Sequence, residues 1–227
     1  KFLLIYILFT FIFTYILWPY LWENPFKNFL ESFAALANWF INLENLYFGT
    51  IVNAKNLPWH YIPGWISIST PIIYLFLFCV GLFAFLYNLK KINLKSANKE
   101  FIYQLYFFGI IFSSLIIVIV LKSTLYNGWR HMYFVYPFII LFAIEGINFF
   151  INKKNIKKFK ILLYFFIFVQ LVALGNWMIK NHPYQYVYFN SFIKKEDLTK
   201  KFDLDYWGLS YKQSFEYLLK NDQSNKI

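Results

Sequence analysis

Long runs of apolar residues, separated by short polar stretches, dominate the hydrophobic pattern of this chain. Five runs reach helical length without alternating polar and apolar positions, so they predict membrane-spanning helices rather than barrel strands. A helix needs roughly 20 apolar residues to cross about 30 Å of hydrocarbon. The predicted spans are 2–21, 66–86, 101–121, 132–151 and 161–178. The predicted fold class is an all-α membrane protein with about five transmembrane helices.

Lysines between these runs orient the predicted spans. One cluster joins the second and third spans, and another joins the fourth and fifth. The first contains Lys90, Lys91, Lys95 and Lys99, and the second contains Lys153, Lys154, Lys157, Lys158 and Lys160. Both clusters face one side in a five-span topology, and the positive-inside rule makes that side cytoplasmic. We therefore expect an integral protein of a bacterial inner membrane with a cytoplasmic N-terminus and an extracytoplasmic C-terminus.

The same topology predicts the domain organisation. Residues 1–178 form a transmembrane bundle and residues 179–227 form an extracytoplasmic tail. Apolar residues at helical spacing over 29–41 predict an amphipathic helix in the extracytoplasmic interface. This helix is either a cover over the bundle or a platform beside a groove for a lipid substrate.

Prolines and a capping signature predict local structure outside the spans. Pro58 and Pro63 disfavour an uninterrupted helix and predict an extended approach to the second span. In the tail, Ser210 followed three residues later by Gln213 forms a capping-box signature. It predicts a short helix over 211–220.

Composition narrows the classes of function. With 59% hydrophobic residues and a mean hydropathy of +0.46, the chain carries more apolar surface than a soluble domain of 227 residues can bury. The net charge of +11 does not indicate nucleic-acid binding, because nine of the 22 basic residues lie in the two lysine clusters. Cys79 is the single cysteine, which excludes an intramolecular disulfide and a multi-cysteine metal site. We expect no metal and no cofactor.

Polar groups concentrate in the predicted extracytoplasmic loop between the third and fourth spans. Its Asn127-Gly128 pair predicts a tight turn, which would present Arg130 at the outer end of the fourth helix. A guanidinium there suits phosphate, because its planar fork can donate two parallel hydrogen bonds. Binding a substrate phosphate and anchoring to a phospholipid headgroup both explain Arg130. The candidate phosphate-binding residues are Arg130, His131, Trp129 and Tyr126, with His60 as a weaker addition.

His60 and the two aspartates of the tail each have both a structural and a functional interpretation. His60 could donate to a phosphate or carry a proton, although a satisfied interfacial histidine is commoner. Asp203 and Asp205 could bind a cation or a sugar hydroxyl, although solvated turn carboxylates are commoner.

Four sequence blocks, in this order, resemble a known family. They are Leu57-Pro58-Trp59-His60-Tyr61, Tyr126-Asn127-Gly128-Trp129-Arg130-His131-Met132-Tyr133-Phe134-Val135-Tyr136-Pro137, His182-Pro183-Tyr184-Gln185-Tyr186-Val187-Tyr188-Phe189-Asn190 and Asp205-Tyr206-Trp207-Gly208-Leu209-Ser210. Over about 150 residues the chain resembles the later half of GT-C type polytopic membrane glycosyltransferases, similar to protein O-mannosyltransferases and bacterial aminoarabinose transferases.

The resemblance implies a membrane enzyme that moves a sugar from a polyprenyl-phosphate donor to a glycan, lipid or protein acceptor on the extracytoplasmic face. In such enzymes an acidic residue in the first outer loop acts as general base, and basic groups stabilise the departing phosphate. Carried over by position, Arg130 and His131 belong to the phosphate side. The first outer segment here opens with Trp22-Glu23-Asn24-Pro25, and Glu23 does not fit the base. We therefore expect the chain to start midway through the family pattern and to be inactive alone.

A non-enzymatic membrane subunit, or a transporter of lipid-linked or small solutes, is the alternative function. A transporter is expected to have polar groups near the membrane midplane and repeated halves with broken helices. The polar groups of this chain gather instead at the predicted outer rim of the bundle. This distribution favours the glycosyltransferase.

Overall fold

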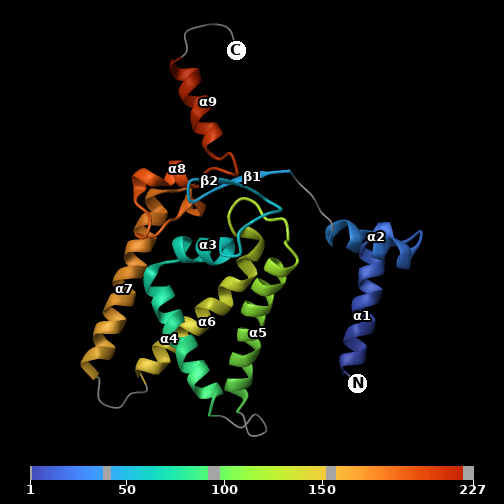
Figure 1. Cartoon of the computed structure of the whole chain (residues 1–227), viewed down its shortest axis with the longest axis horizontal. Helices are drawn as coiled ribbons and strands as arrows, with labels where there is room; N and C mark the ends of the chain where they lie inside the picture. Colours follow the sequence, from blue (N-terminus) through green and yellow to red (C-terminus); the bar gives the residue numbers. More distant parts are fainter. Residues whose placement is uncertain (1, 38–41, 92–97, 152–156, 222–227) are drawn as a thin grey trace. The chain divides into compact units, whose positions relative to one another are not determined.

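The computed structural model is mostly helical, with one small β-hairpin (Figure 1). It describes residues 2–37, 42–91, 98–151 and 157–221. Four helices in the described residues are long and apolar enough to cross a membrane, as in an integral membrane protein. The chain divides into two compact units, Lys1–Ile41 and Asn42–Ile227.

The first unit contains an apolar helix, α1 (Phe2–Leu17), a 3₁₀ turn (Pro19–Leu21) and α2 (Pro25–Ala37). With 16 residues, α1 is shorter than the predicted span 2–21 and is not among the four long helices. It rises about 24 Å. The shortening has a local cause, because Pro19 disfavours a helical backbone at Trp18, whose ψ is 87°.

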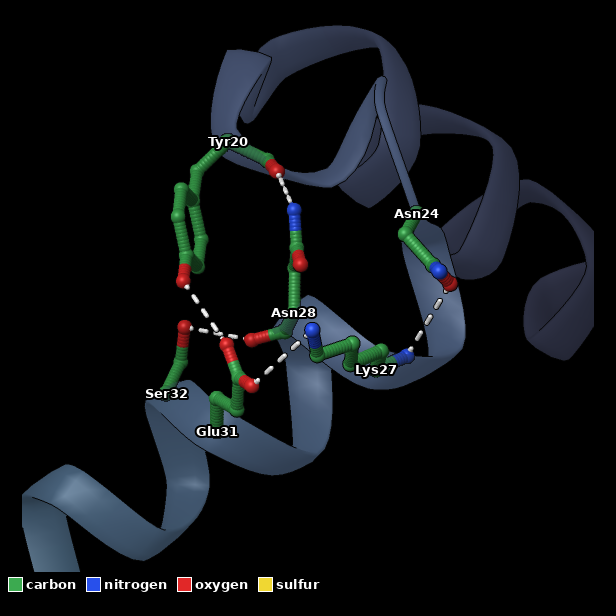
Figure 2. Close-up of polar contacts among 6 residues, drawn as sticks. All are labelled: Tyr20, Asn24, Lys27, Asn28, Glu31 and Ser32. Carbon is green, nitrogen blue, oxygen red and sulfur yellow. Dashed lines mark hydrogen bonds and ion pairs between the residues drawn. The ribbon is translucent and has the colours of Figure 1, made fainter.

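Polar contacts attach α2 to the turn before it (Figure 2). The Asn28 amide donates to the Tyr20 carbonyl oxygen at 2.5 Å, and the Tyr20 hydroxyl donates to Glu31 at 3.2 Å. The Lys27 ammonium lies 3.7 Å from the same carboxylate. The helix expected within 29–41 is therefore present with an earlier start at Pro25, while residues 38–41 lie outside the described residues.

The second unit contains the four long helices (Figure 1). They are α4 (Ile72–Leu89), α5 (Lys99–Val120), α6 (Tyr136–Ile151) and α7 (Lys157–Lys180). α6 reaches the length of a span together with the 3₁₀ helix Arg130–Val135 that leads into it. α4 and α6 approach most closely, at Gly81 and Gly146, where a Cβ on either glycine would overlap a backbone oxygen of the other helix. Leu163 of α7 packs against Leu77 and Ala143 of this pair.

The second predicted span, 66–86, is wrong at its start. Residues Tyr61–Ser69 form a separate helix, α3, and α4 begins only after Pro71. Pro71 requires an extended backbone at Thr70, which has φ −102° and ψ 138°, so the two helices cannot merge. The extended approach predicted from Pro63 is also wrong. Pro63 occupies the third position of α3, where the backbone N–H that proline lacks would have no partner within the helix.

The mostly helical structure agrees with the predicted all-α membrane class, and the sequence did not predict the one small β-hairpin that accompanies the helices. Strands β1 (Glu44–Tyr47) and β2 (Thr50–Asn53) pair antiparallel, with Tyr47 opposite Thr50. The two connecting residues, Phe48 and Gly49, have φ of 50° and 82°, as in the turns that suit the twist of two strands. β1 directs Asn45 and Tyr47 into the protein, where both are buried.

The tail, residues 179–221 in the described structure, packs on the hairpin and α3. Its short helices are α8 (Leu198–Lys201) and α9 (Ser210–Asn221). Asp203 accepts the Leu46 N–H at 2.8 Å, and Phe202 forms a bridge to Tyr47. The Asn190 amide donates to the carbonyl oxygens of Ser67 and Thr70 at 2.6 and 2.7 Å. The tail therefore fastens the break between α3 and α4.

We call the end of the second unit that carries β1, β2 and α3 the hairpin end (Figure 1). Its core is aromatic, and Tyr47, Tyr61, Trp65 and Phe202 contact one another with ring centroids 4.9 to 6.5 Å apart. The ends of α4, α5, α6 and α7 that adjoin the two lysine clusters lie at the opposite end of the unit (Figure 1). Residues 92–97 and 152–156 lie outside the described residues.

Candidate functional site

The segment 122–129, which we call the 122–129 loop, is held on the hairpin by one buried side chain. The Asn45 amide donates to the Leu125 carbonyl oxygen at 3.2 Å, and its oxygen accepts the Asn127 N–H at 3.0 Å. The Tyr61 hydroxyl donates to the same oxygen at 3.3 Å. Asn45 is 2% exposed, so these bonds are shielded from water and fix the loop in one position.

The tight turn predicted at Asn127-Gly128 is confirmed, because the two residues have φ of 58° and 73°. The next residues, Arg130–Val135, form a 3₁₀ helix that leads into α6. The predicted fourth span therefore begins with a tighter helix than expected.

Trp129 anchors the loop from beneath. Its indole is 5% exposed, and its Nε1–H donates to the Ser69 hydroxyl at the end of α3 at 2.8 Å. The ring also makes edge contacts with Tyr133 and Tyr136, with centroids 5.0 and 5.9 Å apart. The only hydrogen-bond donor of the Trp129 side chain is engaged by Ser69, so this side chain has a structural role. By fixing the backbone at Trp129, it also positions the adjacent Arg130.

The Arg130 guanidinium lies over two aromatic rings, one from the same loop and one from the tail. Its guanidinium carbon is 4.6 Å from the ring centroid of Tyr126 and 4.9 Å from that of Trp207. Within the described part of the chain, its Nε is buried and has no hydrogen-bond partner. Stacking holds a guanidinium by its faces and leaves its N–H edge free to donate. Arg130 is therefore a fixed cation with unused donor capacity.

Asp205 holds Trp207 in place. Its carboxylate accepts the N–H groups of Leu209 and Ser210 at 3.0 and 3.1 Å, and it also accepts the hydroxyls of Ser210 and Tyr186. These hydrogen bonds, the two hydroxyls foremost, lower the pKa of Asp205 to about 2. Asp205 is thus a structural acceptor rather than a solvated turn carboxylate, and it takes the Ser210 hydroxyl that the capping-box signature had assigned to α9.

Tyr206 adds a neutral donor beside Arg130. Burial, together with the neighbouring Tyr133, raises the pKa of Tyr206, so its hydroxyl stays protonated at neutral pH. A cavity of about 20 Å³, enough for one small group, is lined by Tyr206, Tyr133 and Trp129 among others. It lies directly beneath the turn at Gly128.

The two predicted histidines lie in different surroundings. His131 is exposed, and its ring makes an edge contact with Tyr126 at a centroid distance of 4.9 Å. His60 precedes α3, and its Nδ1 lies 3.0 Å from the Tyr47 hydroxyl. Burial raises the pKa of Tyr47 to about 12, so this hydroxyl is a neutral partner. His60 lines an open cavity of about 640 Å³ with Tyr47, Phe48 and Asn56.

The structure thus brings together three of the five predicted site residues, Tyr126, Arg130 and His131. Trp129 lies beneath them, and His60 belongs to a separate cavity on the hairpin. Sequence reasoning did not select Trp207 or Tyr206, which the tail returns to the loop. The only signal for them was the resemblance of the block 205–210 to a family pattern.

Among the described residues, no three His, Cys, Asp or Glu side chains gather where they could hold a metal ion. Comparisons of the chain with protein-family models, curated proteins and solved structures found no match. The residues at the hairpin end and their geometry therefore indicate the function.

Proposed function

We propose that this chain is part of a membrane glycosyltransferase that uses a polyprenyl-phosphate sugar as donor, with Arg130 as the residue that contacts the donor phosphate. The observation that supports this most is the position of the Arg130 guanidinium over the rings of Tyr126 and Trp207 at the hairpin end of an apolar helix bundle. A cation held there by aromatic rings suits a ligand with a charged headgroup and an apolar chain.

Sugar transfer from a phosphate donor is accelerated by a cation near the leaving phosphate. When the sugar is transferred, the bond between its anomeric carbon and the phosphate oxygen breaks, and the phosphate keeps the electron pair. Negative charge therefore grows on the phosphate in the transition state, where a fixed guanidinium interacts with it more strongly than in the ground state. Because the rings already orient Arg130, little reorganisation is needed.

The neighbours of Arg130 have supporting roles in this proposal. His131, beside Tyr126, supplies a second donor to the phosphate, and Tyr126 and Trp207 orient the guanidinium. Trp129 fixes the backbone from below through Ser69.

The test is transfer from a radiolabelled polyprenyl-phosphate sugar in membranes that contain the full-length protein. Removing one donor to a developing anion typically costs about 10²–10³ in turnover, so Arg130→Gln is expected to lose that much. Arg130→Lys keeps the charge but not the planar stack, and an intermediate loss is expected. Lys194→Gln, an exposed change in the tail, is the matched control.

Two outcomes would reject parts of the proposal. Turnover of Arg130→Gln within threefold of the unmodified protein at low donor concentration would remove Arg130 from the phosphate site. Donor binding that depends on Arg130, without any transfer to an acceptor, would instead favour a non-enzymatic subunit or a transporter of lipid-linked sugars.

A further inference from the structure

A second groove lies at the hairpin end, away from Arg130. It has a volume of about 320 Å³, within the range of ligand sites, and lies between residues 55–62 and the last turn of α5. Its lining includes Lys55, Trp59, Tyr61, Val118, Ile119 and Lys122. Two ammonium groups from different segments therefore share one groove with an apolar wall.

Lys122 has a left-handed backbone conformation, which is unusual for a lysine. The Ser123 N–H donates to the Val118 carbonyl oxygen at 3.1 Å, and the Lys122 N–H donates to that of Ile119 at 3.3 Å. This is the Schellman ending of a helix, and Lys122 occupies its left-handed position with φ 48°. Glycine is preferred at that position, because a Cβ is strained there. The chain instead has a lysine whose side chain lines the groove.

The last turns of α5, which contribute Val118 and Ile119 to the groove, also carry exposed apolar side chains. Ile116, Ile117 and Val120 are between 54% and 70% exposed and offer hydrocarbon surface on the same helix end. Trp59 is 69% exposed at the groove and has the amphipathic ring typical of the membrane interface. A soluble anion would match the two lysines but would leave this apolar surface uncovered.

The charge of the groove selects among lipids. A zwitterionic headgroup would bring its own cation close to Lys55 and Lys122, whereas a headgroup of net negative charge has no such repulsion. The helix dipole of α5 alone would explain a cation at Lys122, but Lys55 comes from the segment after β2. Two lysines from separate segments therefore line one groove, which suits an anionic ligand.

We propose that this groove binds an anionic membrane phospholipid, with its phosphate between Lys55 and Lys122 and its acyl chain along the end of α5. The site is separate from the proposed contact of Arg130 with a sugar donor and does not depend on it. Its test involves no glycosyl transfer, so the two proposals can fail independently.

The full chain, reconstituted in phosphatidylcholine nanodiscs, is titrated with dibrominated phosphatidylglycerol, whose bromines quench nearby tryptophans. The same titration of Trp59→Phe isolates the signal of Trp59. Each juxtamembrane lysine strengthens binding to anionic lipid about fivefold, so Lys55→Gln and Lys122→Gln are each expected to raise the half-quenching lipid fraction by that factor. The double variant Lys194→Gln/Lys195→Gln, exposed elsewhere in the tail, is the matched control and is expected to show no change.

Lys122→Gly guards against loss of the fold. Glycine suits the left-handed backbone at this position, so the end of α5 is kept or stabilised while the ammonium group is lost. The expected result is the same fivefold weakening with unchanged helicity. Equal quenching of Trp59 by brominated phosphatidylcholine, or unchanged affinity of Lys122→Gly, would overturn the proposal. Displacement of the brominated lipid by millimolar inorganic phosphate would also overturn it, because the lysines would then select a soluble anion.

Discussion

The substitution Gly81→Ala adds one methyl group where α4 crosses α6, and the structure predicts its effect on stability. A Cβ on Gly81 would overlap the Phe142 carbonyl oxygen and lie 2.8 Å from the Gly146 nitrogen. The obstructing atoms are backbone, so no side-chain rotation can relieve the overlap. Gly109, in α5, is the matched control, because a Cβ there would meet nothing within 4 Å. Gly81→Ala must therefore move the helices apart, and Gly109→Ala must not.

The expected difference in stability between Gly81→Ala and Gly109→Ala follows from two opposing effects. Alanine favours a helix over glycine by about 1 kcal/mol, and this gain applies to both variants. Inserting a methyl group into a tightly packed contact costs about 1–3 kcal/mol, and this cost applies only to Gly81→Ala. The helix-propensity gain cancels in the difference between the two variants. We therefore expect Gly81→Ala to be less stable than Gly109→Ala by about 1–3 kcal/mol.

Unfolding in mixed detergent micelles with increasing dodecyl sulfate, followed by circular dichroism, measures this difference. Both proteins are compared with the unmodified chain under the same conditions. If Gly81→Ala unfolds within about 0.5 kcal/mol of Gly109→Ala, the close helix crossing is refuted, because a difference that small is typical of surface substitutions.

Three further predictions concern the hairpin end. The low pKa of Asp205, about 2 against an ordinary 3.8, means that its carboxylate stabilises the tail above about pH 4 and loses this effect as the pH falls toward 2. Pepsin cleavage of the tail in the unmodified chain should therefore rise as the pH falls from about 4 to about 2. Asp205→Asn should be cleaved readily already at about pH 4. Equal cleavage of the two proteins at about pH 4 would contradict this role of Asp205. Trp129→Phe loses the hydrogen bond to Ser69 and should lower the free energy of unfolding by about 1 kcal/mol in thermal melts, whereas an unchanged midpoint would show that this bond contributes nothing. Asn190→Asp keeps the shape but cannot donate to the backbone between α3 and α4, so hydrogen exchange at residues 67–70 should accelerate relative to the unmodified chain, and unaltered protection would exclude the fastening role.

Structural features that depend only on residues close together in the sequence could be predicted from it. A helix in hydrocarbon satisfies its own backbone groups, so an apolar run of sufficient length predicts it without knowledge of the partners. The Asn127-Gly128 turn was predictable for the same reason, because those residue types tolerate positive φ. The start of α4 was misjudged although its cause, Pro71, is local, because an apolar α3 precedes it directly and extends the hydrophobic run.

The hairpin and the partners of Arg130 could not be predicted in this way. Four-residue strands have too short a pattern to identify, and β1 is stabilised by contacts from far along the chain, such as Asp203. Arg130 and Tyr126 are near in sequence, but Trp207 reaches them only because the tail folds back over the hairpin.

The sequence by itself determined that this protein enters a membrane and that a cationic turn lies at the end of one span. Both properties follow from residues that are consecutive in the chain. The tertiary structure decided what surrounds that turn, namely a buried asparagine beneath the loop and two aromatic rings around Arg130. The physical reason is that these contacts join segments far apart in the chain, whose meeting depends on how the whole second unit packs.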